Sequence, residues 1–425
     1  MLPKRLRDLV AATQAIPMTK IGYLLHRFPR ITDTFIKREI RSLQRAGTTV
    51  CVISVWKPDA LETTLDLLND WSTDTHFLLP TSRLSIARNL FSSLVRFPIR
   101  FFDTLRLAIS MSRPGSRGLA YQLFYFVEAV LAAEIMKQKG IAHLHNHIGD
   151  QSGTVTMLAA NLAKIGYSIS FHGWPVFFDA EGSRIKEKVL RASFTRAISY
   201  FCRSQLMMFS GCNDLARLQV IHCGLDLDRY RYRAPAERVS SIFCAARLSP
   251  EKGLDFLIGA LKLLLDQGHE LQLRLAGDGP RREELVRLTD DLKLTDRVHF
   301  LGFLDEDKII RELQDCDLFV LPSFVEGLPV SAMEAMAIGV PVIATNIAGT
   351  SELVEHGRTG LLVRPSDSQA LADAILKMVA DYDLRLGVAE CGRKKIINEF
   401  DITKESEKLN RMLLASGDRY SSISD

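Results

Sequence analysis

The sequence predicts an α/β protein made of two facing Rossmann-like domains, each built on a parallel sheet. Two observations lead to this prediction. Apolar runs of strand length alternate with amphipathic helical patterns in two successive series, which is typical of repeated βα units. In addition, the 425 residues exceed the size at which a single hydrophobic core keeps growing. Two domains of about 200 residues are therefore expected.

The first series covers residues 1–225 and the second covers residues 226–399. The first begins with an apolar run at 21–25, a helical pattern near 34–46 and a second apolar run at 49–56. Its later strands are expected at 142–144, 167–171 and 200–202. The second series starts near Val239, with further strands expected at 271–275, 298–301, 318–321, 342–344 and 360–363. Helices are expected between these strands.

The composition is that of an ordinary globular protein, with 47% hydrophobic residues, 24% charged residues and a net charge of +4. The seven cysteines are scattered without a C-x-x-C pair, which is typical of reduced cysteines in a cytoplasmic protein. The first residues contain no long apolar core or cleavage site, so no secretory signal is expected. The apolar stretch 119–136 contains three polar residues and is expected to form a packed helix rather than a membrane span.

The segment 321–339 places two glutamates, Glu326 and Glu334, eight residues apart around a predicted loop-to-helix turn. A buried strand ends at Pro322, and the helix starting near Pro329 offers its unpaired amides and positive dipole end to an anion. The carboxylates can then hold hydroxyl groups on either side of that anion. A nucleotide sugar has this layout, although an ordinary loop charge and a solvated helix face are the alternative.

A second cluster follows another apolar strand at 242–245, where the segment AARLSPEKG contains Arg247 and Lys252. Arginine is a rigid bidentate donor and lysine a mobile point charge, so together they suit a pyrophosphate that gains negative charge as its bond to a sugar breaks. Two ordinary surface cations are the alternative.

Taken in order, several segments of the second half resemble the retaining glycosyltransferases of family 4, which have the two-domain GT-B architecture. The segments are ARLSPEKG at 246–253, LAGDGP at 275–280, FLGF at 300–303, PSFVEGLPVSAMEAMAIGVPVIAT at 322–345 and GRTGLLV at 357–363. The resemblance covers nearly the whole C-terminal half. It implies that the last helical stretch, within 400–425, crosses back onto the first domain.

The resemblance also implies a role for each matching residue. Arg247 and Lys252 stabilise the departing diphosphate, and Glu326 holds hydroxyl groups of the donor sugar. The amides near Gly327 and Leu328 bind sugar or phosphate, Glu334 binds the ribose, and the base lies near Gly302 and Phe303. His172 follows an apolar strand of the first domain and lies beside the donor hexose, with a backbone-bonded core histidine as the alternative.

The first domain resembles a subgroup of bacterial exopolysaccharide transferases of the colanic-acid type. The resemblance rests on Phe28-Pro29, the run 32–36 and Glu39. The subgroup usually carries Glu where this chain has Asp33, so an acid that touches the acceptor has a shorter reach here. Asp33 and Thr34 are the acceptor candidates, and a helix N-cap at Thr32 or Asp33 is the alternative.

The implied reaction moves a hexose from a UDP-, GDP- or ADP-sugar to a hydroxyl of a glycan, expected to be lipid-linked, in exopolysaccharide or cell-surface polysaccharide synthesis. No cofactor and no metal are expected. His143, His145 and His147 share one face of a predicted strand, but no acidic or cysteine ligand accompanies them in the sequence. A dehydrogenase is excluded because no G-x-G-x-x-G turn follows a strand. A sugar-nucleotide epimerase of the same fold and a non-catalytic nucleotide-sugar-binding partner subunit remain as alternatives.

Residues 83–117 are strongly basic and contain a single acid, Asp103. The basic residues are Arg83, Arg88, Arg96, Arg100, Arg106, Arg113 and Arg117. Apolar residues are interleaved with them, which predicts a surface for an anionic membrane leaflet or a lipid diphosphate acceptor, and hence peripheral association at the inner face of the cytoplasmic membrane. A solvated helical insertion whose arginines cover apolar surface is the alternative. Nucleic acid is not expected, because no binding motif accompanies the arginines.

Overall fold

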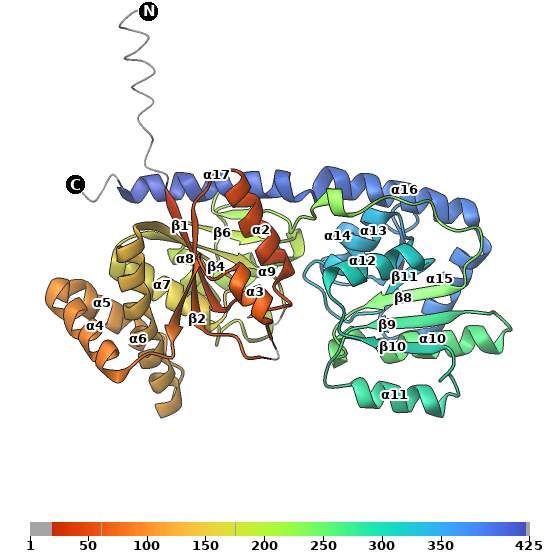
Figure 1. The fold of residues 1–425 in the computed structure, drawn as a ribbon, viewed down its shortest axis with the longest axis horizontal. Coiled ribbons are helices and arrows are strands. Elements are labelled where there is room, and N and C mark those ends of the chain that lie inside the picture. Colours follow the sequence, from red (N-terminus) through yellow and green to blue (C-terminus); the bar gives the residue numbers. More distant parts are fainter. Residues whose placement is uncertain (1–18, 61, 175, 422–425) are drawn as a thin grey trace, which may run out of the picture.

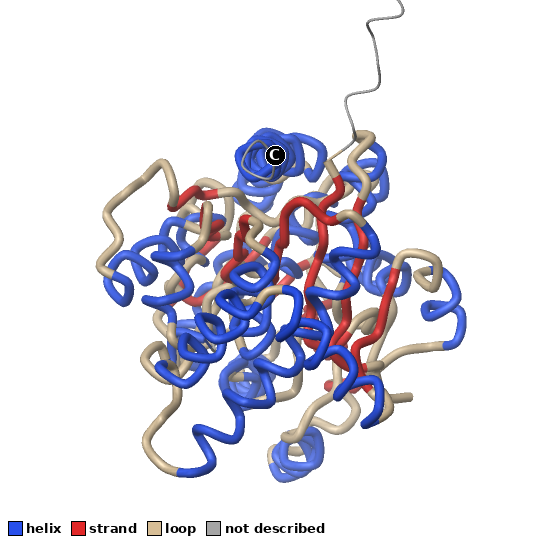
Figure 2. Tube along the Cα trace, turned by 90° about the vertical axis from the view of Figure 1, so that its left-hand side faces the viewer, coloured by secondary structure: helices blue, strands red, loops and turns tan. Residues whose placement is uncertain are grey.

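The computed structural model describes residues 19–421 with the exception of 61 and 175. Two α/β lobes lie side by side, and the last two helices run along the same side of both lobes (Figure 1). Viewed along the long axis of the molecule, the strands are flanked by helices (Figure 2). The predicted architecture of two Rossmann-like parallel-sheet domains is confirmed.

The first lobe contains a seven-stranded parallel sheet in the order β3-β2-β1-β4-β5-β6-β7. Its strands are β1 (Lys20–Arg27), β2 (Val50–Trp56), β3 (Thr75–Leu79), β4 (Ile141–His147), β5 (Gly166–Phe171), β6 (Phe194–Ala197) and β7 (Leu218–Val220). Its helices are α2 (Thr34–Arg45), α3 (Leu65–Asp70), α4 (Arg83–Arg96), α5 (Pro98–Ser110), α6 (Ser116–Lys139), α7 (Gln151–Ala163), α8 (Ile185–Arg191) and α9 (Tyr200–Ser210).

The second lobe contains a six-stranded parallel sheet in the order β10-β9-β8-β11-β12-β13. Its strands are β8 (Ser241–Ala245), β9 (Gln272–Ala276), β10 (Val298–Gly302), β11 (Leu318–Leu321), β12 (Val342–Thr345) and β13 (Leu361–Val363). Its helices are α10 (Leu254–Asp266), α11 (Arg282–Asp291), α12 (Glu306–Asp315), α13 (Val330–Ile338), α14 (Thr350–Leu353), α15 (Ser368–Ala380) and α16 (Tyr382–Glu399).

Each sheet reverses its strand order once, between β1 and β4 in the first and between β8 and β11 in the second. In open α/β sheets, ligands bind beyond the carboxyl ends of the strands at such a reversal. The loops after β8 and β11 carry Arg247, Lys252 and Glu326. The topology therefore predicts a ligand site at these loops.

The final helix, α17 (Ile402–Ser421), packs against the first lobe. Its Leu409 and Leu413 are fully buried in a cluster with Ile21, Tyr23 and other residues of the first sheet. In addition, the Thr48 hydroxyl donates to the Asn410 side chain at 2.7 Å. Residues 422–425 of the predicted last helix and residues 1–18 of the predicted first domain lie outside the described residues.

One predicted strand is wrong. Residues 200–202 open helix α9 instead, because the Ser199 hydroxyl accepts a hydrogen bond from the Cys202 amide and caps that helix. The strand lies earlier, at Phe194–Ala197. Strands β3 and β7 were not predicted; they are short edge strands with little apolar periodicity.

Helix α6 is the one described helix that is long and apolar enough to cross a membrane by length and composition, contrary to the prediction that its polar residues make it too polar to span. It nevertheless packs within the first lobe, as predicted. Its buried residues include Phe126, Val130 and Met136, together with the polar Gln122 and Glu128. A helix that packs in the core of a globular domain can pass the same compositional test as a membrane span.

Candidate functional site

Lys252 and Glu326 form an ion pair between the loops that follow β8 and β11. The Lys252 Nζ lies 2.6 Å from the Glu326 Oε1. The buried Ser323 hydroxyl donates to the same oxygen at 2.7 Å. The side chains of Lys252 and Glu326 are 20% and 12% exposed, so the pair retains access to solvent and to a ligand.

The two loops are joined by their backbones as well as by this pair. The Phe324 amide donates to the Glu251 carbonyl at 2.8 Å. Gly253 has a left-handed φ of 57°, and a Cβ there would lie 2.5 Å from the Pro322 carbonyl oxygen. This glycine therefore allows the two loops to approach closely and positions Lys252 beside Glu326.

Gly327 lies at the contact between the two lobes. A Cβ at this position would lie 2.1 Å from the His172 carbonyl oxygen of the first lobe. The Ser199 hydroxyl, also from the first lobe, donates to the Gly327 carbonyl at 3.0 Å. Across the described part of the chain, the Gly327 and Leu328 amides have no hydrogen-bond partner.

Helix α13 begins directly after this loop with Pro329 at its N-cap, and no side chain caps it. The first amides of the helix and those of Gly327 and Leu328 are thus available at one place. Unpaired amides and the positive end of a helix dipole favour an anion such as a phosphate.

Arg247 is exposed near the start of the loop after β8. Its guanidinium forms no ion pair with any residue that the structure describes. Of the two predicted diphosphate ligands, Lys252 is thus already neutralised by Glu326, and Arg247 provides the uncompensated positive charge.

Glu334 projects from α13 and is bonded across the lobe boundary. Its Oε1 accepts from the Arg38 guanidinium of α2 at 2.7 Å and from the Tyr230 hydroxyl at 3.0 Å. The same guanidinium bonds to Glu306 of α12, with the Arg38 Nε 2.8 Å from the Glu306 Oε1. Burial and the nearby Glu334 carboxylate both raise the pKa of Tyr230, so this hydroxyl remains a donor.

A cavity of about 720 Å³ lies between the lobes beside this cluster. Phe303 and Glu334 line it from the second lobe, and Thr32, Thr34 and Arg38 line it from the first. Arg247, Lys252, Glu326 and His172 do not line this cavity. Phe303, predicted to lie near the nucleotide base, and Glu334, predicted to bind the ribose, therefore line the same cavity, and Gly302 adjoins Phe303 in sequence. The Lys252–Glu326 pair lies outside this cavity.

His172 faces the second lobe through its carbonyl group, whereas its ring is bonded within the first lobe. The ring Nε2 lies 2.8 Å from the His147 Nδ1, and the ring Nδ1 lies 3.8 Å from the Cys223 sulfur. Burial lowers the pKa of His172 well below its usual value, so the ring is neutral at neutral pH. A direct contact of this ring with a sugar would require these bonds to change.

His147 connects His172 to a buried carboxylate. The His147 Nε2 lies 3.0 Å from the Glu39 Oε1, which also accepts from the Tyr23 hydroxyl at 2.7 Å. Burial alone would raise the pKa of Glu39, but the charge of Arg196 and the hydrogen bond with His147 hold this pKa well below its usual value. A carboxylate only accepts hydrogen bonds, so the His147 Nε2 carries its proton toward Glu39.

The atoms of Glu39, His145 and His147 that can bind a metal all lie within 4.8 Å of one another. This grouping combines two histidines of the predicted strand face with Glu39, an acid that lies far from them in the sequence. The His145 ring nitrogens bond to Ser168 at 2.7 Å and Ser170 at 2.9 Å. Hydrogen bonds within the protein already satisfy these nitrogens.

Asp33 and Thr34, the predicted acceptor residues, lie at the start of α2. Asp33 occupies the N-cap position, but its side chain does not cap the helix. Its buried carboxylate instead forms an ion pair with Arg30 at 2.8 Å. Thr34 lines the cavity between the lobes.

Residues 233–395 match the family described as Glycosyl transferases group 1. The chain is 29% identical to a putative colanic acid biosynthesis glycosyltransferase of Escherichia coli, over 93% of this chain and all of the relative. It is 26% identical to the amylovoran biosynthesis glycosyltransferase of Erwinia amylovora, over 90% of this chain and 96% of the relative.

Solved structures share the fold. The crystal structure of Anabaena HepE in complex with UDP and glucose matches with a TM-score of 0.71 and 22% identity, covering 93% of this chain and all of that one. Sucrose-phosphate synthase from Thermosynechococcus elongatus matches with a TM-score of 0.68 and 20% identity, covering 93% of this chain and 99% of that one. The GT-B architecture is thus confirmed.

Proposed function

We propose that this chain, a glycosyltransferase of exopolysaccharide biosynthesis with a Glycosyl transferases group 1 domain at residues 233–395, moves a hexose from a nucleoside-diphosphate sugar to a glycan hydroxyl with retention of anomeric configuration. The donor lies between the lobes. The acceptor is a lipid-linked saccharide. The seven cysteines are free, and six of them are buried, which supports a reducing, cytoplasmic location.

The observation that carries this proposal is the Lys252–Glu326 pair at 2.6 Å, beside the unpaired amides of Gly327 and Leu328. A diphosphate held by those amides and by Arg247 would place its sugar beside Glu326. Its nucleoside would then extend along α13 toward Glu334 and the cavity lined by Phe303.

Negative charge develops on the diphosphate as the glycosidic bond breaks. A positive group already in place stabilises this charge more in the transition state than in the ground state, and therefore increases the rate. Arg247 is the uncompensated cation, and the Lys252 ammonium can transfer part of its bonding from Glu326 to phosphate. We assign the departing phosphate oxygen as the base for the acceptor hydroxyl, following the front-face mechanism proposed for the resembled family.

The first test replaces Arg247 with alanine. We expect kcat to fall roughly 100-fold or more, since the charge developing on the leaving group is the interaction lost. The thermal midpoint should be unchanged, because this guanidinium is exposed and unpaired. Arg238→Ala, another exposed arginine of the second lobe, is the matched control. Normal turnover by the Arg247 variant would refute its role.

For the acceptor, we propose the polar cavity of about 580 Å³ beyond the carboxyl ends of β4 and β5, which the predicted acceptor residues Asp33 and Thr34 do not line. Tyr121 and Tyr125 line it with nearly parallel rings 6.4 Å apart, and ring faces of this kind suit a sugar. Arg117 lines it with an exposed cation. Replacing Arg117 with alanine should raise the KM for an anionic acceptor several-fold without changing the donor KM. An unchanged acceptor KM would remove this assignment.

Product analysis separates the remaining possibilities. Incubation with UDP-, GDP- and ADP-hexoses in turn identifies the base, and proton NMR of the product gives its anomeric configuration. Conversion of donor to an isomeric nucleotide sugar without acceptor would indicate an epimerase. Binding without turnover, in the presence of acceptor, would indicate a partner subunit.

A further inference from the structure

Helix α4 is apolar on two opposite sides. Ile86 and Leu90 pack against the hydrophobic core of the first lobe. On the outer side, Leu84, Phe91 and Val95 are 80%, 69% and 62% exposed. Their separations of seven and four residues place them on one face of the helix. This outer face is therefore largely exposed.

Helix α5 continues the same pattern. Ile99, Phe102 and Ile109 are 77%, 58% and 45% exposed, and their spacing again defines one helical face. Figure 1 shows α4 and α5 at the outer end of the first lobe, away from the second lobe. We refer to these six apolar residues as the α4–α5 face.

The charges around this face are almost all positive. Arg88 and Arg106 lie on the same helical faces as the apolar residues, and Arg83 and Arg96 flank them. None of these four arginines forms an ion pair with a residue described in the structure. Asp103 is the single acid in α4 and α5.

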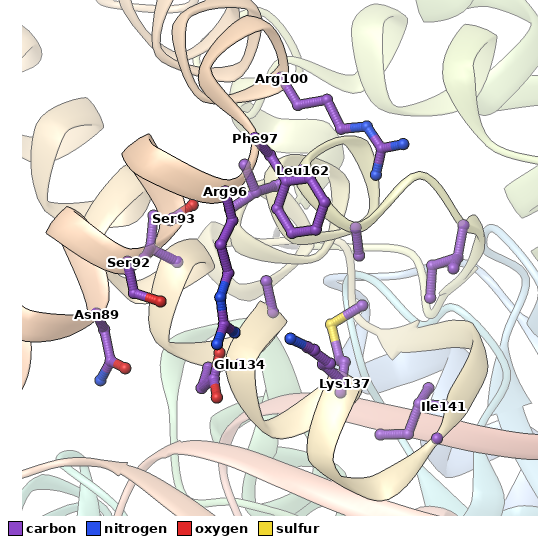
Figure 3. Close-up of a pocket in the computed structure, with 16 residues that line it drawn as sticks. Asn89, Ser92, Ser93, Arg96, Phe97, Arg100, Glu134, Lys137, Ile141 and Leu162 are labelled. Atoms are coloured by element: carbon purple, nitrogen blue, oxygen red, sulfur yellow. The ribbon is translucent and has the colours of Figure 1, made fainter.

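A cavity of about 280 Å³ opens beneath the junction of α4 and α5 (Figure 3). Apolar side chains, including Phe97, Met136 and Leu162, form most of its lining. Arg96 and Lys137 also line it, and Figure 3 shows their heads on the same side as the Glu134 carboxylate. The cavity thus combines an apolar interior with three cations, Arg96, Arg100 and Lys137, and one acid, Glu134.

Aliphatic and aromatic side chains interleaved with unpaired arginines match the two chemical parts of an anionic lipid. Arginine can remain at the headgroup level while its stem lies along apolar groups. A nucleic acid would satisfy the arginines but leave the six apolar residues in water. An apolar protein surface would cover those residues but would leave the arginines without a negatively charged partner.

We propose that the α4–α5 face docks onto a membrane leaflet containing anionic phospholipid. The apolar residues enter the acyl boundary, and Arg83, Arg88 and Arg106 lie among the phosphates. The cavity beneath takes part of one acyl chain, with the phosphate of that lipid near Arg96 and Lys137. This inference concerns location and does not depend on the proposed reaction.

Flotation of the full chain with vesicles tests the proposal. We expect co-flotation with phosphatidylcholine vesicles that contain phosphatidylglycerol, and little with phosphatidylcholine alone. The triple variant Phe91→Ser, Ile99→Ser, Phe102→Ser should lose about 1,000-fold or more in partitioning, because each apolar side chain contributes roughly ten-fold or more. The double variant Arg88→Glu, Arg96→Glu should lose about 25-fold or more, at about five-fold per basic residue.

Met208→Ser and Arg238→Glu are the matched controls, since Met208 is 63% exposed on α9 and Arg238 is exposed in the second lobe. Neither should change flotation. Equal binding to neutral and anionic vesicles, or loss of binding in the controls to the same degree, would overturn the proposal. So would self-association of the chain through this face without vesicle binding.

A third variant, Ala133→Trp, fills the cavity while leaving the outer face intact. Native mass spectrometry with short-chain phosphatidylglycerol should show one bound lipid on the unmodified chain and none on this variant, and excess inorganic phosphate should not displace the lipid. Equal lipid binding by both would remove the cavity from the proposal. Donor binding should be unchanged in every variant, so a failure here is distinct from a failure of the proposed reaction.

Discussion

Glu326 and Glu334 show how two identical side chains, eight residues apart, acquire different surroundings. Glu326 pairs with Lys252 of its own lobe, whereas Glu334 pairs with Arg38 of the other lobe. A ligand that binds Glu326 must share it with Lys252. A ribose that binds Glu334 must share it with Arg38 and Tyr230. In the proposed donor complex, binding would thereby be linked to the contact between the lobes.

Gly327→Ala should impair the approach of the two lobes. The added Cβ would lie 2.1 Å from the His172 carbonyl oxygen, and a backbone atom cannot rotate away as a flexible side chain can. Overpacking of this kind costs roughly 1–3 kcal/mol, so we expect kcat/KM to fall about ten-fold or more. Steady-state kinetics and small-angle scattering provide the measurement.

Gly387→Ala is the control for this substitution. Gly387 lies within α16, and a Cβ there would meet nothing within 4 Å. Because alanine favours the helix over glycine, this change should stabilise the chain by roughly 0.5–1 kcal/mol without affecting activity. Equal activity of the two alanine variants would show that the contact at Gly327 is dispensable.

At the scale of single elements, helix α6 combines a core position with buried polar groups. Glu128 is buried on this helix, and desolvation raises its pKa to about 8. The folded chain thus holds this carboxyl in its neutral form at neutral pH. Burial of this carboxyl therefore lowers the stability of the packing around α6 at pH values where the unfolded chain is ionised.

Glu128→Gln should remove a pH dependence of stability. Below about pH 4.5 both folded and unfolded chains carry the Glu128 proton, so the group has no effect. Between about 4.5 and 8 the unfolded chain loses this proton while the folded chain keeps it, so stability falls as pH rises. The glutamine variant should therefore exceed the native chain in free energy of unfolding by a margin that grows from pH 5 to pH 8, reaching a few kcal/mol. A difference in free energy of unfolding between the two chains that stays constant from pH 5 to pH 8 would contradict the prediction.

For the whole molecule, the lobes are held together by polar contacts as well as by the close packing at Gly327. The Glu352 carboxylate of the second lobe accepts from the amides of Tyr200 and Phe201, at 2.7 and 2.6 Å. These amides begin α9 of the first lobe, where a helix dipole favours negative charge. Arg38 adds its bonds to Glu334 and Glu306. Such contacts can re-form after a hinge motion.

Glu352→Gln should shift the molecule toward separated lobes. A hydrogen bond to a charged group contributes roughly 1.5–3 kcal/mol, so we expect the donor KM to rise several-fold and the radius of gyration of the free chain to increase. Glu355→Gln is the control, because Glu355 pairs with Lys395 and Arg358 inside the second lobe. An unchanged radius and KM in the Glu352 variant would indicate that lobe closure does not use this contact.

The apolar periodicity by itself determined the two parallel-sheet domains and most strands of the second one, because strands buried on both faces must be continuously apolar. Predicted strand 318–321 coincides with β11, whereas the predicted strand at 200–202 failed because a single serine cap outweighed the apolar run. Local patterns also placed Lys252 and Glu326 on loops directly after strands.

Only the tertiary structure decided which side chains are partners. Arg38 bonds to a residue 296 positions away, and the Glu39–His147 bond spans 108 positions, so no local pattern contains either pair. Arg38 and Tyr230 escape sequence-based prediction for this reason, whereas Ser323 lies only three residues from its partner Glu326. Periodicity reports which face of an element is buried, whereas the partner of a charge depends on how whole elements come together in space.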